Sequence, residues 1–420
     1  MSDNKTSVEK RSSWSNFGPG VLVAGSAVGT SHIVQSTRAG ADFGLGFLIV
    51  FILIALVKYP GTRFGKDYAD ATGKSLLDNY TSYGWVVISL YSIVIFLTLA
   101  FVSAALGLVS ASILNALLPL NINSRYLTVG ILAVSGCLLM LGKYSFLEKL
   151  NKVLVPAFTI LILATTAIVA NQTDWSAINW AFPAANKANL IYLIAIAGWL
   201  LAPMEVSVFL SFWTNEKAKT RKAKTLGADK SVNNFDFNLG YWMSLVLALC
   251  FLLMGASLLS DQASELPSAG GAFIQEIIKL FSNALGDWSY SIIAFIAMTV
   301  MYSTLLTVMD GYARNVQVLL KFTPARHVKN LFNVGVLSVT ISGILVILLF
   351  MNSFTTFIDL VGILVFVLAP IYAILNHKAV FGPDIAPDKQ PSNFMKVASL
   401  AGIIVMSLVA VSYLYLRFAG

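Results

Sequence analysis

The sequence predicts an all-α membrane protein whose chain crosses the bilayer eleven times. Of its 420 residues, 57% are hydrophobic and 11% are charged, whereas soluble domains carry about 25% charged residues. A transmembrane helix needs about 20 mostly apolar residues, and eleven stretches of the chain meet or approach this requirement, three of them interrupted by Gly, Pro or polar residues. The composition therefore excludes an ordinary soluble enzyme.

The eleven spans are expected to form two groups of five and one extra helix. Residues 1–16 are a polar cytoplasmic tail, 17–170 hold the first five spans, 171–375 the next five, and 376–420 the eleventh span and the carboxyl terminus. Because no short apolar region with a small-residue cleavage site follows the tail, no cleaved signal peptide is expected. The spans centre on residues 17–37, 45–58, 85–110, 126–142, 154–170, 190–212, 239–259, 290–312, 332–350, 354–375 and 395–416.

The basic residues predict how the chain lies in the membrane. The formal net charge is +8, and inner loops of membrane proteins are enriched in Lys and Arg. With the amino terminus in the cytoplasm, 23 of the 28 basic residues fall on the inner side, including those of Lys58–Lys74 and Lys217–Lys230. The surplus of basic residues is therefore explained by the orientation of the chain in the membrane, and no nucleic-acid partner is expected. We expect a multi-pass protein of the inner or plasma membrane with its carboxyl terminus outside.

Residue patterns typical of catalysis or metal binding are sparse. Cys137 and Cys250 lie in apolar runs without a Cys or His at ligand spacing, so we expect them to pack rather than to form a disulfide or a metal site. The sequence contains no nucleophile-elbow pattern and no P-loop, and no stretch between the spans is long enough for a separate domain. These observations argue against a membrane enzyme or receptor and favour transport driven by an ion gradient.

Spans one and six are interrupted at membrane depth. Gly25–His32 contains two glycines and four polar residues, and Gly198–Glu205 places Pro203 near an ionisable side chain. Freed backbone groups cost several kcal/mol in hydrocarbon unless they face protein or a water-filled cavity. Simple kinks are the alternative interpretation. Each interrupted span opens a group of five, as in secondary transporters built from inverted repeats, which favours a substrate site at the two breaks.

The first span also carries a motif of a known family. Gly18-Pro19-Gly20 and the later Ala39-Gly40-Ala41-Asp42-Phe43-Gly44 resemble the first helix of Nramp-type divalent metal transporters (natural resistance-associated macrophage proteins), and the proline-interrupted sixth span and the span count agree. The resemblance covers nearly the whole chain in layout and is specific in spans one, six and eight. It implies the LeuT-type fold, with two inverted five-helix repeats plus one helix and with helices 1 and 6 broken. It also implies alternating access around a midplane site.

The chain departs from this family at the residues that would hold the metal. Aligned from the Gly-Pro-Gly, the family's Asp-Pro-Gly-Asn becomes Gly29-Thr30-Ser31-His32, so the metal-binding Asp and Asn are missing. The family's Met-Pro-His in helix 6 becomes Ala202-Pro203-Met204, which lacks both functional side chains. Trp85–Ile113, the third span, contains none of the family's acids. The resemblance therefore indicates a divergent branch with a replaced metal site.

The replaced site is expected to suit a small anion. Metal ions need carboxylate, carbonyl, imidazole or sulfur ligands, and burying a divalent ion without a countercharge is steeply unfavourable. Neutral donors at half-helix amino termini match an anion better. Bicarbonate is favoured, although nitrite, formate or another small monoanion fits the same donors. Structural alternatives are a hydrogen-bonded helix residue for His32 and packing for Trp199. The expected substrate-binding residues are Gly29, Thr30, Ser31, His32, Trp199, Ala202, Pro203, Met204 and Glu205.

A sodium site is expected beside the substrate. In LeuT-type transporters, which the family resemblance implies, sodium commonly lies between hydroxyls of helix 8 and freed carbonyls of helix 1. Two hydroxyls of span eight share a face by their i, i+4 spacing, but such hydroxyls also often bond back to their own helix. Apart from Na⁺ as coupling ion, no cofactor and no transition-metal site are expected. The expected sodium ligands are Gly25, Val28, Ser303, Thr304 and Thr307.

Charged residues near the span ends are expected to pair locally. Asp310 lies one turn before Arg314, and Arg38 and Asp42 are also four residues apart, a spacing that favours ion pairs on a helix. Asp359 lies near the outer end of span ten and is either a gate residue or an interfacial one.

Two transport functions therefore remain. A secondary transporter of a small anion with sodium as the coupling ion is the first interpretation. The alternative is a transporter of manganese, iron or magnesium with a rebuilt site, for which His32, Met204 and Glu205 are the remaining ligand candidates. Either way, the partners are a small inorganic ion and the lipid bilayer. The oligomeric state is left open, with a monomer compatible with the sequence.

Overall fold

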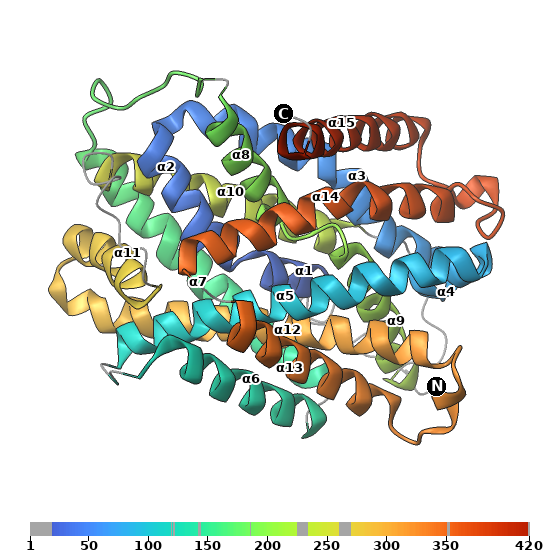
Figure 1. Cartoon of the computed structure of the whole chain (residues 1–420). Helices are drawn as coiled ribbons and strands as arrows, with labels where there is room; N and C mark the ends of the chain where they lie inside the picture. The colour runs from blue at the N-terminus through green and yellow to red at the C-terminus, as the bar shows by residue number, and fades with distance from the viewer. Residues whose placement is uncertain are drawn as a thin grey trace, which may run out of the picture.

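The predicted all-α class is confirmed by the computed structural model. It describes residues 19–118, 120, 122–141, 144–184, 186–224, 234–259, 270–350 and 353–418, in which every regular element is a helix (Figure 1). Nine helices of this described part are long and apolar enough to cross a membrane. The count of eleven spans is compatible with this result and stays a prediction. The predicted tail, residues 1–16, lies outside the described residues.

The first five predicted spans all coincide with helices. The helices of this half are α1 (Pro19–Ala27), a π-helical segment (Ser31–Ser36), α2 (Thr37–Phe43), α3 (Leu48–Thr72), α4 (Leu76–Tyr80), α5 (Trp85–Leu117), α6 (Ser124–Leu141) and α7 (Tyr144–Gln172). The short α4 was not expected. It begins with a capping box in which the side chains and backbone N–H groups of Ser75 and Asp78 bond reciprocally.

The remaining six predicted spans also coincide with helices. These helices are α8 (Lys187–Trp199), α9 (Val206–Lys224), α10 (Phe235–Leu258), α11 (Gly270–Leu285), α12 (Tyr290–Leu320), α13 (Leu331–Phe350), α14 (Phe354–Val380) and α15 (Asn393–Phe418). The sequence interpretation missed α11, which packs against α5, α7 and α12.

Helix α3 is much longer than the predicted span at residues 45–58. It continues to Thr72, where Gly73 ends it with a φ of 71°, a left-handed conformation that glycine adopts without a steric penalty. Lys58 therefore lies inside the helix, with 2% of its surface exposed. Its placement in an inner loop was wrong, because the apolar run that ends at this lysine is only the first part of the helix.

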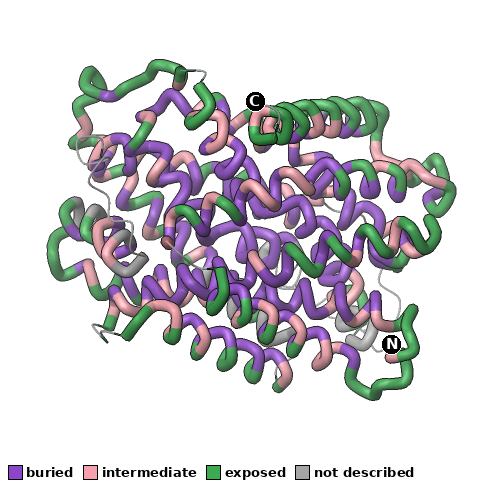
Figure 2. The backbone as a smooth tube through the Cα atoms, viewed as in Figure 1, coloured by how far each residue is buried: buried purple, intermediate pink, exposed green. Residues whose placement is uncertain are grey.

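The two interrupted spans cross the centre of the molecule in opposite directions. The π-helical segment of helix 1 contacts α8, which precedes the break in helix 6, whereas α1 contacts α9, which follows that break. Burial is concentrated around these helices, and α15 lies at the edge with much of its surface exposed (Figure 2). The two breaks thus meet in the middle of the fold, far from solvent.

Glycines allow the central helices to touch through their backbones. A Cβ atom added at Gly198 of α8 would lie 1.9 Å from the carbonyl oxygen of Gly362 on α14. A Cβ added at Gly65 of α3 would lie 1.9 Å from the carbonyl oxygen of Ser207 on α9. Since neither backbone can yield without moving its helix, these contacts fix α8 and α9 on their neighbours.

We predict that Gly198→Ala lowers stability. The new methyl group would force α8 away from α14, which costs about 1–3 kcal/mol of unfolding free energy and lowers the melting temperature by several degrees. Thermal unfolding of the purified protein in detergent measures the change. Gly130→Ala is the control, because a Cβ at Gly130 of α6 has nothing within 4 Å. Equal melting temperatures for the two variants would contradict the close contact.

Candidate functional site

Helix 1 breaks directly after α1. Val28 and Gly29 leave the helical conformation, and the hydroxyl of Thr304 on α12 lies 2.7 Å from the carbonyl oxygen of Gly25 and 2.8 Å from that of Val28. These carbonyls are among those that the break frees from helical bonding. A side chain of α12 therefore supplies the hydrogen-bond donor at the carboxyl end of α1.

Helix 6 breaks directly after α8. Leu201 and Ala202 have φ values of 59° and 74°, in a left-handed region that costs non-glycine residues about 1–3 kcal/mol each. Pro203 follows and carries no N–H group, and α9 begins at Val206. The surrounding structure must hold this unwound segment in place.

Lys58 of α3 holds the unwound segment of helix 6. Its ammonium group lies 2.7 Å from the carbonyl oxygen of Leu200 and 2.6 Å from that of Ala202. The carbonyl oxygens of Ala197 and Gly198 lie farther away, at 3.2 Å and 3.4 Å. The buried Nζ atom of Lys58 therefore lies at the negative, carboxyl-terminal end of α8.

A small cavity of about 10 Å³ lies between the two breaks. This volume is about what one ordered water molecule needs, so a larger guest requires the helices to separate. The cavity is lined by residues of both breaks, α5 and α12, namely Ser26, Ala27, Thr30, Ser31, Val102, Leu106, Trp199, Ala202, Pro203, Glu205, Val206, Phe209, Thr304, Val308 and Tyr312.

Six of the nine predicted substrate residues line this cavity. The hydroxyl of Thr30 is buried and has no hydrogen-bond partner within the described part of the chain. The indole N–H of Trp199 donates to the carbonyl oxygen of Ile358 at 2.8 Å, which fixes this edge of the ring on α14. The six residues are Thr30, Ser31, Trp199, Ala202, Pro203 and Glu205.

The other three predicted substrate residues lie outside the cavity lining. The Nε2 atom of His32 lies 2.8 Å from the carbonyl oxygen of Ser244 on α10, to which it donates because a carbonyl only accepts. The sulfur of Met204 lies 3.9 Å from the hydroxyl of Thr62 on α3. Gly29 sits at the break itself, and a Cβ there would point at the side chain of Thr304. Substrate contact by these three residues stays a prediction.

Glu205 brings a carboxylate into the cavity. It is 1% exposed and accepts a hydrogen bond from the hydroxyl of Tyr312 on α12. Lys58 is close enough to act on it electrostatically. The sequence identified the acid but not this lysine, so it missed the opposite charge that accompanies the acid in the interior.

Only some of the predicted sodium ligands lie close to one another in the structure. Thr304 joins the carbonyl oxygens of Gly25 and Val28, as described above. The hydroxyl of Ser303 is buried without a hydrogen-bond partner among the described residues. Thr307 donates to the Ser303 carbonyl oxygen at 2.8 Å, the bond to its own helix that was the alternative interpretation. Sodium binding here stays a prediction.

A charged network joins α2, α8 and α14. Arg38 forms a two-pronged ion pair with Asp359, with N–O distances of 2.9 Å and 3.3 Å. Gln35 donates to the same carboxylate at 2.8 Å, and the guanidinium of Arg38 lies 5.0 Å from the ring centre of Tyr192. The predicted partner of Arg38, Asp42, is replaced by an acid from a distant helix. The network of Arg38, Asp359 and Tyr192 thus connects both broken helices to α14.

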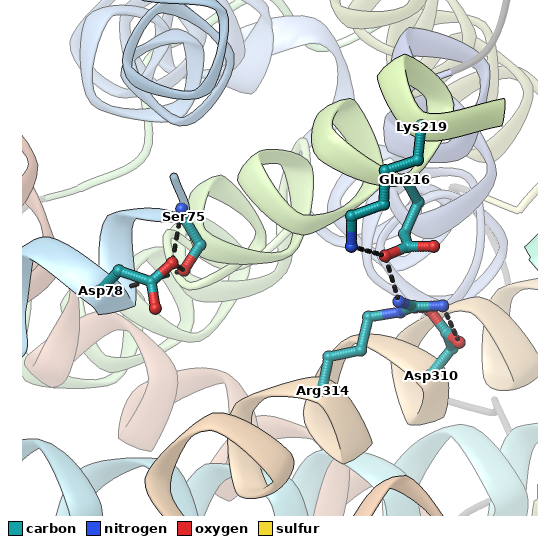
Figure 3. A network of polar contacts seen from close by, with 6 residues as sticks. All are labelled: Ser75, Asp78, Glu216, Lys219, Asp310 and Arg314. Carbon is teal, nitrogen blue, oxygen red and sulfur yellow. Dashed lines mark hydrogen bonds and ion pairs between the residues drawn. The ribbon is translucent and has the colours of Figure 1, made fainter. Parts of the chain in front are cut away.

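A second charged network lies on the opposite side, where α9 meets α12. The predicted pair of Asp310 and Arg314 is confirmed, with an N–O distance of 2.8 Å. The indole N–H of Trp213 on α9 donates to Asp310 at 3.1 Å, and Glu216 lies 3.7 Å from Arg314 (Figure 3). Polar networks thus link the helices near the two breaks, one through Asp359 and one through Asp310.

The fold and the enclosed site between two broken helices define a membrane transporter of the LeuT type. A family model described as natural resistance-associated macrophage protein-like matches residues 20–416, so the chain belongs to the Nramp family. An uncharacterized protein of Pasteurella multocida is 34% identical over 394 residues, which cover 90% of this chain and 89% of that protein.

Solved structures show the same fold. A manganese transporter of Eremococcus coleocola, solved as a mutant, aligns with a TM-score of 0.71 at 14% identity, covering 96% of this chain and 87% of that one. MhsT in complex with L-phenylalanine aligns with a TM-score of 0.65 at 12% identity, covering 94% and 97%. At these identities the likeness establishes the fold alone.

We predict that Asp359→Asn weakens the contact between α2 and α14, so that the helices part more often there and expose the cavity to solvent. The exchange keeps an acceptor oxygen but removes a charge whose hydrogen bonds contribute about 1–2 kcal/mol. A cysteine introduced by Thr30→Cys, in a protein whose Cys137 and Cys250 are replaced by alanine, should then react about tenfold faster with a water-soluble maleimide.

Asp42→Asn is the matched control for this labelling experiment. Asp42 lies on the same helix as Arg38 but forms no ion pair with it in the described structure. Its exchange should leave the labelling rate unchanged. If Asp42→Asn accelerates labelling and Asp359→Asn does not, the local pair is the one that limits this opening.

Proposed function

We propose that this Nramp-family transporter moves a small inorganic anion by alternating access. Bicarbonate is the favoured substrate, Na⁺ is the coupling ion, and the protein works as a secondary transporter in the inner or plasma membrane with its amino terminus in the cytoplasm. One observation carries the proposal: the cavity is lined by two half-helix amino termini and an unpaired hydroxyl, and position 29 lacks a carboxylate.

The donors that face the cavity favour a negative guest. Thr30 and Ser31 begin the second half of helix 1, and Val206 begins α9; all three line the cavity. Helix amino termini carry partial positive charge, which favours an anion without a charged side chain. In the closed structure the N–H groups of Val206 and His32 donate to the nearby carbonyl oxygens of Pro203 and Gly29, so an anion would replace such bonds. The unpaired hydroxyl of Thr30 adds a donor that becomes satisfied when an anion binds.

The charges around the cavity also favour a monoanion over a divalent cation. When both are ionised, the charges of Glu205 and Lys58 cancel, so a divalent ion would enter with two uncompensated charges. The desolvation penalty of an ion rises steeply with its charge. The carbonyl oxygens that helix 6 offers at its break are bonded to Lys58, which leaves a metal ion few free ligands there.

The alternative function, transport of a divalent metal ion, has one observation in its favour. Glu205 lines the cavity, and carboxylates are preferred ligands of manganese and magnesium. However, His32 and Met204 lie outside the lining. Among the described residues, no group of three or more His, Cys, Asp and Glu side chains is placed to hold a metal ion. We therefore rank metal transport second.

An anion that enters a negative cell interior must be driven uphill. Sodium is the proposed driver because the carbonyl oxygens of Gly25 and Val28 converge on the hydroxyl oxygen of Thr304, and the neutral hydrogen bonds between them would give way to sodium contacts when the ion binds. The neighbouring Ser303 hydroxyl is buried without a partner in the described part of the chain. Oxygen atoms of this kind are the ligands that hard cations require.

We predict that purified protein in liposomes accumulates radiolabelled bicarbonate when sodium is present outside only. Uptake should fall to the level of empty liposomes when potassium replaces sodium, because the coupling ion is then absent. A trapped metal-sensitive dye tests the alternative in the same liposomes. Quenching of this dye by external manganese, without bicarbonate uptake, would reverse the ranking of the two functions.

We predict that Thr304→Ala weakens the sodium dependence of this uptake. Loss of the hydroxyl at the two carbonyl oxygens should raise the sodium concentration for half-maximal uptake about tenfold, which corresponds to about 1.4 kcal/mol. Thr304→Ser keeps the hydroxyl and should keep the response. Thr299→Ala is the control, because Thr299 of α12 donates to its own helix at Phe295. An unchanged sodium concentration for half-maximal uptake in Thr304→Ala would contradict a sodium site at this residue.

A further inference from the structure

The strongest unexplained feature of the interior is the ammonium group of Lys58. Ionisable residues at membrane depth are costly and are usually paired and functional. Lys58 is 2% exposed, and its hydrogen-bond partners are neutral backbone carbonyls rather than a carboxylate. The fold therefore places the Nζ atom of Lys58 at one defined point, the broken end of α8.

Glycines of α3 bring this lysine to the break. A Cβ added at Gly61 would lie 3.0 Å from the sulfur of Met204, and Gly65 touches the backbone of Ser207, as described above. Residues with side chains at these two positions would hold α3 away from the unwound segment. Lys58 lies about one turn before Gly61, so its side chain reaches the carbonyl end of α8.

The carbonyl oxygens around Lys58 would otherwise form a cation site. Half-helix carboxyl ends with freed carbonyls coordinate cations in transporters with broken helices. Here the ammonium group makes its two shortest contacts, 2.7 Å and 2.6 Å, to the oxygens of Leu200 and Ala202. A lysine side chain of the protein thus contacts the carbonyl oxygens that would otherwise be available to bind a cation from solution.

The charge of Lys58 also acts on the cavity. Ala202, whose carbonyl oxygen accepts from Lys58, is itself part of the cavity lining. Glu205 lines the cavity and feels the same ammonium group. In a low-dielectric interior such an interaction is strong: when both groups are ionised, the ammonium group compensates the carboxylate, so that Glu205 neither repels an anion nor gives a cation a net attraction.

We infer that Lys58 is a resident cation that determines the sign of the transported ion. It satisfies the carbonyl end of helix 6, so that no metal ion is needed there, and it compensates the charge of the Glu205 carboxylate that lines the neighbouring cavity. The expected effect on bicarbonate rests on the proposed function. The expected effect on cation binding does not depend on it. Lys58 is thus a specificity-determining residue for the site between the two breaks.

Three exchanges at this position separate charge from hydrogen bonding. Lys58→Gln keeps donors for the carbonyl oxygens but removes the charge, Lys58→Arg keeps the charge, and Lys58→Ala removes both. Lys66→Gln is the matched control, because Lys66 is a buried lysine of the same helix whose partner is Asp70. Each variant is first checked for a single cooperative thermal transition in detergent.

Counterflow of radiolabelled bicarbonate and calorimetric titration with manganese chloride are the two readouts. We expect Lys58→Gln to weaken bicarbonate affinity by about tenfold or more. Lys58→Arg and Lys66→Gln should stay near the unmodified protein. We expect Lys58→Ala to gain manganese binding that the unmodified protein lacks, because the carbonyl oxygens and Glu205 are then free of the ammonium group.

The two readouts distinguish failure of this inference from failure of the proposed function. Bicarbonate exchange by the unmodified protein with unchanged affinity in a folded Lys58→Gln variant would overturn the role of Lys58 and leave the function intact. If the unmodified protein exchanges no bicarbonate, the proposed function fails. The inference is then decided by manganese: gained binding in Lys58→Ala supports a resident cation, and no binding overturns it.

Discussion

Two helices of this protein are interrupted in an apolar interior, and every other feature of the site follows from the need to satisfy the freed backbone groups. An unpaired buried carbonyl group has no water to bond with at this depth. The chain meets this need in two different ways: a neutral hydroxyl, that of Thr304, serves helix 1, and a charged ammonium group, that of Lys58, serves helix 6. The second solution changes the electrostatics of the centre as well as its hydrogen bonding.

The surroundings of the breaks are rigid on some sides and held by polar networks on others. Backbone contacts at Gly198 and Gly65 lock α8 onto α14 and α3 onto α9. Arg38 of α2 pairs with Asp359 of α14, and Trp213 of α9 donates to Asp310 of α12. Close-packed contacts move as units, whereas polar contacts can break one at a time and reform with water as the partner. This combination suits a site that is enclosed at rest and reached only when a network opens.

Much of the fold and the positions of both breaks could be predicted from the sequence, because hydrophobic length and helix-breaking residues are local signals. Glu205 and Thr30 were identified in the same way and line the cavity. The partners of Lys58 and Arg38 could not be predicted, since they lie more than 130 positions away in the chain. The apolar run ends at Lys58, so the sequence alone suggests that this lysine lies at the membrane surface. The inward course of the rest of α3 depends on glycine contacts that appear only in three dimensions.

The enclosed volume at the centre limits how fast such a molecule can work. Space for about one water molecule offers no continuous aqueous pore, so ions cannot stream through in single file. Under the proposed alternating access, helices would have to part on one side of each ion and then on the other, and rearrangements of this kind take microseconds to seconds. The transport rate would then be set by conformational cycles, and more flux would require more copies of the protein.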